Sequence, residues 1–377
     1  MTGMPFPACV PELTDGLALL RAHRPEDLDR IVEQSRDAQS LRWTTIPRPY
    51  TEKDGGEWLA LIEAGWNDER GNRHWAVTSA SDPDSAYLGT IDVRPGPGMA
   101  AEVGYGLHPA GRGAGLMASA LRLVCQWWFG QGGTRMHWQA ERGNFASWRV
   151  AWSCGFTYHG TVPGSLPAAQ GPPVDAWKAS LGADDVMEAR TPWEDPPVLA
   201  SAEAGGIRLR PWRDEDVLHL ESRDQPAHHM PARGVLDADT FPEWLLVRRE
   251  FMARGSSMSW CVADERTDAA LGEVLVFVKQ GTLDDDAAEL GYQVLPSARG
   301  RGVATAAARV VMHHALRSRG EGGMGLRRLV AGTAEDNLAS NTVLDRLGFR
   351  IWGHETAADL LPDGRTVDAL HWELLRP

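Results

Sequence analysis

The two halves of this 377-residue chain carry the same sequence pattern, and this internal repeat restricts the folds available to it. In the first half the segment AEVGYGLHPAGRGAGLMASALRLV begins at Ala101, and its counterpart AELGYQVLPSARGRGVATAAARVV begins at Ala288. The two segments align without a gap, so that Arg112 corresponds to Arg299. Because a chance match would not hold register over such a length, the chain is predicted to contain two copies of one domain.

Three further blocks repeat in the same order. LRAHRPEDL from Leu20 resembles LRPWRDEDV from Leu209, GNFASWRVAWSCGF resembles DNLASNTVLDRLGF, and VDAWKASL late in the first half resembles VDALHWEL near the end of the second. The offset between the copies changes only between blocks, as loop insertions and deletions would produce. We therefore predict an N-terminal domain at 1–182 and a C-terminal domain at 205–377, joined by an exposed, acidic, Pro/Ala-rich linker at 183–204.

The hydrophobic periodicity of each copy switches between strand and helix patterns. A short strand ends at Arg21 or Arg210, and two helices, three strands, a glycine-rich turn and a long helix follow. A strand, a short helix and a final pair of strands close each copy, and the Pro/Gly-rich stretch 162–173 is predicted to be a loop before the last strand. The predicted fold class is α/β, with an α+β mixed sheet: each domain has one twisted mixed β-sheet flanked by helices on both faces.

Composition excludes several classes of partner. The net charge of −13 and the pI near 5.4 argue against nucleic acid and anionic membranes, and they are compatible with a cationic substrate such as an amine, although the acidity would also serve solubility alone. No apolar run approaches the ~20 residues of a membrane helix, and no secretory signal pattern is found. The four cysteines form no CxxC pair, so free thiols in a reducing cytoplasm are expected, without a disulfide or a metal site.

A glycine-rich turn opens the long helix of each copy. The turns read RGAGLM from Arg112 and RGRGVA from Arg299, and each follows a predicted strand. A helix N-terminus leaves about four backbone N–H groups unpaired and carries roughly half a positive charge, which suits a diphosphate. Glycines allow close approach of the backbone, and the arginine adds positive charge. A tight turn without a ligand is the alternative, but two copies in the same context favour a phosphate site.

Each half resembles the GCN5-related N-acetyltransferase (GNAT) superfamily, and within it the RimJ/RimL-type ribosomal-protein acetyltransferases. The family signature (Q/R)xxGx(G/A) is matched in full by Arg299, Gly302 and Ala304, whereas Met117 replaces the small last residue in the first copy. The resemblance implies tandem GNAT-fold domains with acetyl-CoA as cofactor. The residues implied to bind it are Leu107, Arg112, Gly113, Gly115, Leu116, Met117 and Asn144 in the first copy, and Leu295, Arg299, Gly300, Arg301, Gly302, Val303, Ala304 and Asn337 in the second.

Proteins of this family bind acetyl-CoA in a gap between two splayed central strands, so the resemblance implies such a gap in each copy. It also implies a bulge in the strand at Val103–His108 and at Leu290–Pro296, which would free backbone N–H groups as an oxyanion hole for the thioester carbonyl. Glu102 and Glu289 begin these strands and are implied to be the catalytic bases that take the proton of the amine, directly or through a water. A surface glutamate at a strand end is the alternative interpretation.

The general acid is implied to be a serine. Many members of the superfamily place a tyrosine seven residues after the Asn landmark, but Ala151 and Leu344 occupy those positions. The RimJ/RimL-type relatives use the serine three residues after the Asn, which gives Ser147 and Ser340 as catalytic residues. A serine that only satisfies backbone amides at a helix start is the alternative.

The acceptor side differs between the copies. RWTTIPRPYT, residues 42–51, resembles the substrate segment of RimJ/RimL-type enzymes, which implies that Trp43 and Tyr50 bind substrate. The second copy has DQPAHHMPARGVL in its place. Its adjacent His228 and His229 would make a base or ligand pair, but polar surface is the favoured interpretation for neighbouring loop histidines. No metal is predicted.

The leading hypothesis is an N-acetyltransferase, an acyltransferase that moves acetyl from acetyl-CoA to a primary amine by direct attack in a ternary complex. The acceptor is a peptide N-terminus or the amine of a small molecule or antibiotic, and the sequence does not choose between them. The alternatives are that one copy is a non-catalytic acyl-CoA-binding or dimer-mimicking module, or that the donor is a longer acyl-CoA. Because single-domain relatives often pair, we expect a monomer with pseudo-dimeric tandem domains or a homodimer.

Overall fold

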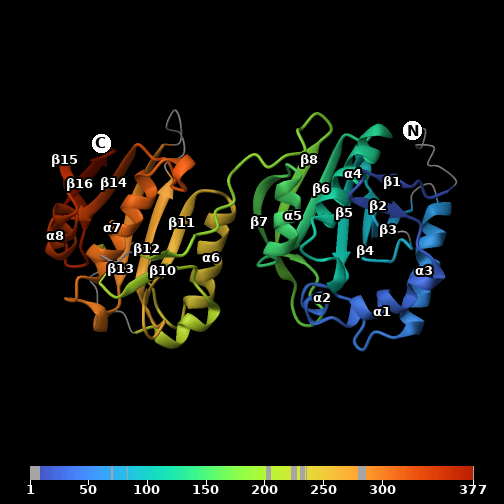
Figure 1. The fold of residues 1–377 in the computed structure, drawn as a ribbon, viewed down its shortest axis with the longest axis horizontal. Helices are drawn as coiled ribbons and strands as arrows, with labels where there is room; N and C mark the ends of the chain where they lie inside the picture. Colours follow the sequence, from blue (N-terminus) through green and yellow to red (C-terminus); the bar gives the residue numbers. More distant parts are fainter. Residues whose placement is uncertain are drawn as a thin grey trace. The chain divides into compact units, whose positions relative to one another are not determined.

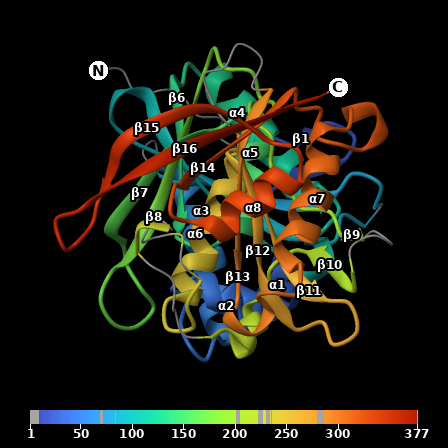
Figure 2. The same ribbon diagram turned by 90° about the vertical axis from the view of Figure 1, so that its left-hand side faces the viewer.

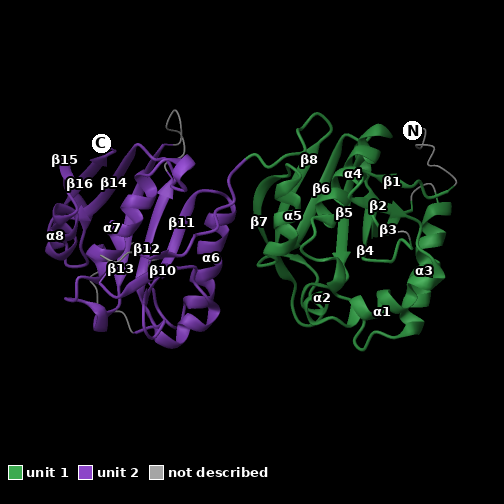
Figure 3. Cartoon of the chain, viewed as in Figure 1, with its two compact units in different colours: residues 1–190 green, residues 191–377 purple. Residues whose placement is uncertain are grey.

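The computed structural model describes residues 9–68, 71–82, 84–200, 205–221, 227–229, 234, 236–278 and 286–376. The chain divides into two compact units, residues 1–190 and 191–377 (Figure 3). Each unit holds one eight-stranded mixed sheet with helices, which confirms the predicted fold class. None of the described helices combines the length and the apolar character needed to span a bilayer.

The sheet of the first domain contains one parallel pair of strands. Its strands are β1 (Leu13–Thr14), β2 (Ala18–Arg21), β3 (Arg73–Ser79), β4 (Gly89–Pro95), β5 (Ala100–Leu107), β6 (Arg135–Glu141), β7 (Thr157–Leu166) and β8 (Val174–Gly182). They lie in the order β1-β2-β3-β4-β5-β6-β8-β7 (Figure 1). Only β5 and β6 are parallel, so the chain crosses over between them through helix α4 (Leu116–Gly130).

Helices cover both faces of this sheet. α1 (Leu28–Arg36), α2 (Ala38–Trp43) and α3 (Glu52–Asn67) precede β3, and α5 (Phe145–Ser153) follows β6. Successive side chains of β3 point to opposite faces. Ala76 joins the core formed by α1 and α3, whereas the ring of Trp75 lies 4.9 Å from that of Trp127 on α4. The sheet is therefore buried between two helical layers.

The second domain repeats the topology of the first. Its strands are β9 (Leu199–Ala200), β10 (Ile207–Arg210), β11 (Ser257–Asp264), β12 (Ala270–Val278), β13 (Ala287–Val294), β14 (Arg328–Ala334), β15 (Arg350–Leu360) and β16 (Thr366–Leu375). The order from the β9 edge is β9-β10-β11-β12-β13-β14-β16-β15, with β13 and β14 parallel. Its α-helices are α6 (Phe241–Ala253), α7 (Val303–Leu316) and α8 (Leu338–Arg346). Helices α7 and α8 share one face of the sheet (Figure 2).

The first helix predicted for the second copy is a short 3-10 helix, η4 (Asp214–His219), and not an α-helix like α1. The apolar spacing explains the difference. In the first copy Leu28, Ile31 and Val32 form a helical stripe, whereas ESRDQP follows Leu220 in the second and offers no apolar residue to continue one. Residues 222–226 lie outside the described part of the chain. A second 3-10 helix, η5 (Ala227–His229), follows them.

A buried ion pair fixes the same corner of each domain. Arg21 donates to both carboxylate oxygens of Asp27 at 2.8 and 2.7 Å, and Arg210 makes the same two bonds to Asp216. All four side chains are buried. Each aspartate also accepts a backbone N–H from three residues earlier. The pair therefore joins the end of β2 or β10 to the first helical turn, which explains why the two blocks LRAHRPEDL and LRPWRDEDV keep these residues.

The segment predicted as an exposed linker, 183–204, is divided between the two units. Arg122 of α4 donates to the carbonyl of Met187 at 3.2 Å, and Trp260 of β11 donates to the carbonyl of Pro197 at 2.9 Å. Residues 199–200 form β9, and residues 201–204 are not described. The stretch 162–173 also differs from its prediction as a loop, because β7 extends to residue 166 by pairing with β8.

Candidate active site

The two parallel neighbours at the centre of each sheet separate partway along their length. The pairing of β5 with β6 ends at Val103 and Trp138, although both strands continue beyond that point. The pairing of β13 with β14 ends in the same way at Glu289 and Val330. Each domain thus has the implied gap between two central strands, with a backbone edge on either side that is not used in sheet pairing.

The bulge that the resemblance implies at Val103–His108 and Leu290–Pro296 is not found in these strands, which are described throughout. β5 pairs with β4 in continuous register from Ala101 to Leu107, and β13 pairs with β12 in continuous register along its length. A bulge is unnecessary for freeing amides here. The separation from β6 or β14 already leaves one edge of the strand without a partner strand.

The glycine-rich turns have the same backbone conformation in both domains. Gly115 and Gly302 are the N-caps of α4 and α7, with φ of 75° and 78°, in the left-handed region. A Cβ on Gly302 would meet no atom within 4 Å, and one on Gly115 would meet only a Leu17 methyl at 3.7 Å. Gly113 and Gly300 also have positive φ and open space in front of them. The open N-terminus of each helix fits a diphosphate.

The arginine of each turn folds back onto the strand before it. Arg112 donates to the Leu107 carbonyl at 3.3 Å and to Asp37 Oδ2 at 2.5 Å, and Arg299 donates through Nε to the Val294 carbonyl at 3.3 Å. The hydrogen bond from Arg112 is the main cause that lowers the pKa of Asp37. These contacts give the arginine a role in closing the strand–helix turn, in addition to its positive charge near the N-terminus of the helix.

The other residues implied to bind the cofactor fall into two groups. Leu116, Met117, Val303 and Leu295 are buried and pack into the domain cores. Leu107 and Ala304 are half-buried, and Arg301 is exposed. The side chains of the first group therefore pack into the domain cores, so that any direct contact with a ligand would come from their backbone. Met117 fills the core where the signature expects a small residue.

The Asn landmarks are helix N-caps. Asn144 begins α5 and its Oδ1 accepts the backbone N–H of Ser147 at 3.2 Å. Asn337 begins α8 and accepts the N–H of Ser340 at the same distance. Each helix starts directly after the strand that lines the gap, β6 or β14. Both serines are half-buried, and the Asn side chain, not the serine hydroxyl, caps the helix in each domain.

Two tyrosines that the sequence analysis missed connect the gap strands to these serines. Tyr105 of β5 donates to the Ser147 carbonyl at 2.8 Å. Tyr292 of β13 reaches the Ser340 carbonyl at 3.2 Å, and its hydroxyl lies 2.8 Å from Ser340 Oγ. Burial raises the pKa of both, that of Tyr292 to about 12. The repeated GY in AEVGY and AELGY was the available signal, but it does not reveal which helix the hydroxyl reaches.

The serine hydroxyls have different neighbours in the two domains. Trp138 of β6 donates through Nε1 to Ser147 Oγ at 3.1 Å, and its side chain is buried. Ala331 stands at the corresponding position of β14, where the hydroxyl of Tyr292 takes the place of the indole as the neighbour of Ser340 Oγ. The first domain therefore has an indole N–H donor beside the candidate general acid, and the second domain has none at the corresponding position.

The two glutamates lie where the strands separate. In the parallel pairing Glu102 is opposite His137, and Glu289 is opposite Val330. Glu102 Oε1 accepts from Arg94 Nη1 at 2.9 Å and from Gln139 Nε2 at 3.0 Å, which fixes the orientation of the carboxylate. Both glutamates are half-buried. Each glutamate therefore lies beside the point where the parallel strands of its own domain separate.

The residues implied to bind substrate occupy different environments. Trp43 is half-buried at the end of α2, with the Arg42 guanidinium 4.1 Å from its ring centroid. Tyr50 is only 6% exposed and packs in the core between α1 and α3. The burial of Tyr50 does not support direct contact with substrate. Arg42 also forms an ion pair with Glu141 at the end of β6, with 2.8 Å between Nη1 and Oε1. This ion pair holds α2 beside the gap.

In the second domain two histidines of η5 lie in the segment that replaces residues 42–51 of the first domain. His228 Nε2 lies 2.9 Å from Asp336 Oδ2, and His229 Nε2 lies 2.9 Å from Asp336 Oδ1. Asp336 directly precedes Asn337, the N-cap of α8. The prediction that these histidines are ordinary polar surface misses this convergence, because the partner is more than a hundred residues away in the sequence.

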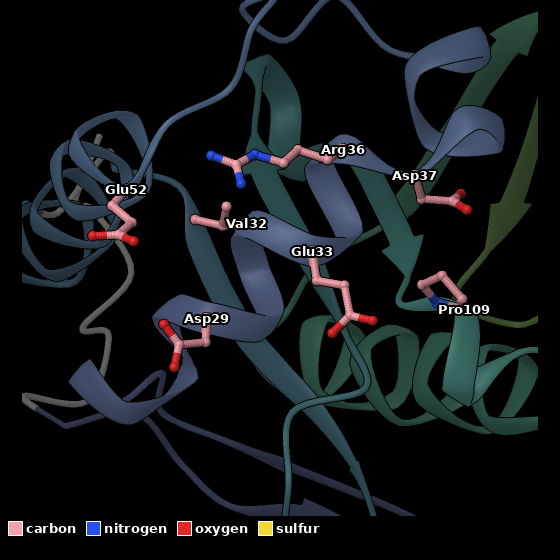
Figure 4. Close-up of a pocket in the computed structure, with 7 residues that line it drawn as sticks. All are labelled: Asp29, Val32, Glu33, Arg36, Asp37, Glu52 and Pro109. Atoms are coloured by element: carbon pink, nitrogen blue, oxygen red, sulfur yellow. The ribbon is translucent and has the colours of Figure 1, made fainter.

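A cavity of 480 Å³ lies beside α1 and the end of β5 (Figure 4). Its charged lining is mostly acidic. The residues that line it are Asp29, Val32, Glu33, Arg36, Asp37, Glu52 and Pro109. Two of the carboxylates have basic partners, since Glu33 lies 3.1 Å from His108 and Asp37 bonds Arg112. The excess of carboxylates would favour a cation in this cavity.

Comparisons with known proteins agree with this arrangement. The acetyltransferase (GNAT) domain family matches residues 18–157 and 207–350. Similar solved structures include Mycobacterium smegmatis RimJ in complex with CoA-disulfide (TM-score 0.42, 16% identity, 48% of this chain and 91% of that one) and a Bacillus anthracis acetyltransferase of the GNAT family (0.40, 15%, 46% and 99%). RimL, a ribosomal L7/L12 alpha-N-protein acetyltransferase, is another (0.40, 16%, 46% and 93%). No curated protein matches the chain. The chain belongs to the GNAT acetyltransferase family and consists of two GNAT domains in tandem.

Proposed function

We propose that the protein is an acetyl-CoA-dependent N-acetyltransferase that modifies a primary amine by direct transfer in a ternary complex. The observation that carries the proposal recurs in both domains: parallel strands separate beside an open helix N-terminus that a left-handed glycine caps. A coenzyme A thioester requires a groove with free backbone groups and a site for its diphosphate. Acetyl-CoA would supply the activated acetyl group.

The residues around the gap have complementary roles in this proposal. Glu102 or Glu289 takes a proton from the ammonium group, so that the amine nitrogen forms its bond to the acetyl carbon as the carbon–sulfur bond breaks. Unpaired backbone N–H groups of β5 or β13 donate to the carbonyl oxygen, where negative charge develops. Ser147 or Ser340 donates its proton to the departing sulfur and takes up the second proton of the amine nitrogen in exchange, so that a thiol and a neutral amide are formed. Its Asn N-cap holds it beside the gap.

The acceptor is proposed to be a cationic amine, either a peptide N-terminus or an amine of a small molecule. The net charge of −13 and the acidic cavity of the first domain favour the approach of a cation. Deprotonation is the cost of such a substrate. At pH 7 it is about 1 kcal/mol for an α-amine but roughly 4–5 kcal/mol for a lysine-like amine, which makes a carboxylate base more valuable for the latter.

A second candidate is that only one domain is catalytic and the other binds acyl-CoA without turnover. The turn signature favours this candidate, because Ala304 completes it in the second domain whereas Met117 replaces its small last residue in the first. The serines also differ, since the indole N–H of Trp138 donates to Ser147 Oγ. In the second domain the Ser340 hydroxyl has a phenol as its neighbour. On this reading turnover belongs to the second domain, which also carries the complete turn signature.

Calorimetric titration of the purified chain with acetyl-CoA tests the proposal. Two sites per chain are expected if both domains bind acetyl-CoA. One site would mean that one of the two domains does not bind it. Separate Glu102→Gln and Glu289→Gln variants then assign turnover, since each change removes one base and keeps the shape of the side chain. Absence of acetyl-CoA binding would overturn the proposal, and titration with a longer acyl-CoA would show whether only the donor had been misassigned.

A further inference from the structure

The cluster of His228, His229 and Asp336 has the composition of a metal site. Imidazole nitrogens and carboxylate oxygens are ligands of Zn²⁺ and related divalent ions. The three side chains come from two separate segments, η5 and the residue before the N-cap of α8, and each brings one potential ligand atom close to the others. Convergence of this kind is not required by the fold, because the first domain builds the same region without it.

The spacing of the ligand atoms suits one ion. The Nε2 atoms of His228 and His229 lie 2.9–3.1 Å from the carboxylate oxygens of Asp336, and all the ligand atoms lie within 4.8 Å of one another. Ligands held about 2.0–2.1 Å from Zn²⁺ in a tetrahedron are about 3.3 Å apart. Small rotations of the side chains would therefore admit an ion without movement of the backbone.

Burial also favours a site over ordinary surface. The side chains of His228 and His229 are only 15% and 17% exposed, and their rings meet edge to face with centroids 4.3 Å apart. Asp336 is 51% exposed. Two shielded imidazoles with a carboxylate open to solvent would hold an ion with three protein ligands and leave a coordination position for water or another ligand.

We propose that the second domain binds one divalent transition-metal ion, of the Zn²⁺ class, through His228 Nε2, His229 Nε2 and the Asp336 carboxylate. The ion would fasten η5 to the N-cap of α8, next to the residues that hold Ser340. In the first domain the corresponding link is the Arg42–Glu141 ion pair, and Gly143 stands where the second domain has Asp336. The proposal does not depend on acetyl transfer, because metal binding is measured directly.

A neighbouring group provides a matched control. Glu335, His354 and Asp368 also bring three possible ligand atoms together, and His354 Nε2 lies 3.2 Å from Asp368 Oδ2. Here the histidine is 48% exposed and two of the three groups are acidic. This second group contains one imidazole instead of two, so we expect a weaker hold on a transition metal there.

The experiment uses the full-length protein after treatment with a chelator and removal of the chelator. Zn²⁺ is titrated by calorimetry, and Co²⁺ is titrated in parallel because its visible absorption reports imidazole coordination. We expect one ion per chain. Each of His228→Gln, His229→Gln and Asp336→Asn should weaken the affinity by about 100-fold or more, whereas His354→Gln should leave it unchanged.

Three outcomes would overturn the proposal: no saturable binding by the parent protein, full affinity in the His229→Gln variant, or a loss of binding that follows His354→Gln instead. The folding of each variant is checked by its circular dichroism spectrum and by calorimetric titration with acetyl-CoA. A folded variant that has lost metal affinity supports the site. If the parent protein fails to bind acetyl-CoA, the proposed enzyme activity is contradicted, whereas the measured metal affinity keeps its meaning.

Discussion

The hydroxyl of Tyr292 lies 2.8 Å from the Oγ of Ser340, and it is also 3.2 Å from the Ser340 carbonyl. One phenol thus links β13, the strand on one side of the gap, to α8, the helix that follows the strand on the other side. In the first domain Tyr105 donates to the Ser147 carbonyl at 2.8 Å, and the indole of Trp138 donates to the serine hydroxyl. The link positions the candidate general acid differently in the two domains.

The changes in the second domain are made in a Glu102→Gln background, and the matched change in the first domain in a Glu289→Gln background, so that the turnover of each domain is measured alone. Replacement of Tyr292 by Phe is then expected to lower kcat about 10-fold, the effect of losing one hydrogen bond of ~1–1.5 kcal/mol. KM for acetyl-CoA should change little, because the phenol contacts the serine and not the diphosphate site. Ser340→Ala should cost about 100-fold or more if the serine is the general acid. Since burial raises the pKa of Tyr292 to about 12, the pH profile below pH 9 should keep its shape in Tyr292→Phe. Steady-state kinetics of the two variants, with Tyr105→Phe as the matched change in the first domain, would measure these effects, and an unchanged kcat in Ser340→Ala would exclude the assignment.

Replacement of Gly302 by Ala should weaken acetyl-CoA binding by roughly 10-fold. The left-handed φ of 78° costs a non-glycine residue about 1–2 kcal/mol, and the new Cβ would project into the open space assigned to the diphosphate. Gly364→Ala is the control, because Gly364 has φ of 84° and equally open surroundings but lies in the β15–β16 turn. Both variants should lose similar stability in denaturant unfolding, and only Gly302→Ala should change calorimetric affinity. Equal affinity in the two would argue against a phosphate site at this turn.

The sequence predicted the features of the fold that depend on local pattern. Periodicity and the repeat identified two copies of one mixed-sheet domain, and the turn glycines fall at left-handed helix caps as the phosphate argument requires. The Asn landmarks of the family are N-caps in the structure. An N-cap is a local feature, because the side-chain oxygen accepts the backbone N–H of the residue three positions later, so a short sequence segment is enough to predict it. Helix α1 was predictable from its apolar stripe for the same reason.

The missed features depend on residues far apart in the chain. The Tyr292–Ser340 contact, and the meeting of His228 and His229 with Asp336, arise only when a strand and a helix from different segments come together. The bulge implied for β5 and β13 was wrong, because both strands pair in continuous register. Their backbone groups are freed instead where the parallel strands separate. Tyr50 is implied to bind substrate by a family segment; this stays a prediction, and the structure adds that its neighbours include core residues. Neither the register of the strands nor the burial of Tyr50 could be predicted from the local sequence segment.

Removal of one partner of a buried ion pair should strongly destabilise the second domain. Glu273 of β12 is almost fully buried and accepts from Arg248 of α6 at 2.7 and 3.1 Å, from Ser259 at 2.8 Å and from Gln293 at 2.7 Å. Arg248→Met would leave the carboxylate without its counter-charge, and we expect a loss of about 3–5 kcal/mol in the free energy of unfolding. The double variant with Glu273→Leu should recover most of that loss. In contrast, Arg327→Ala, which breaks an exposed pair with Asp286, should cost about 1 kcal/mol or less in the same denaturant titrations.

The first domain should lose stability below neutral pH because of His23. Both ring nitrogens of His23 are shielded from solvent without a hydrogen-bond partner, and the ring meets Trp58 edge to face. Burial lowers the pKa of His23 to about 3, and the same cause lowers the pKa of His74 in the same core. The folded domain therefore binds fewer protons than the unfolded chain between pH 6.5 and pH 3. Its stability is complete above pH 6.5 and falls below that value by up to about 1.4 kcal/mol per pH unit for each such histidine. Denaturant unfolding between pH 7.5 and pH 5 should show this slope, and His23→Phe should reduce it while leaving the contribution of His74. A slope that is the same in the variant and the parent would place the acid sensitivity elsewhere.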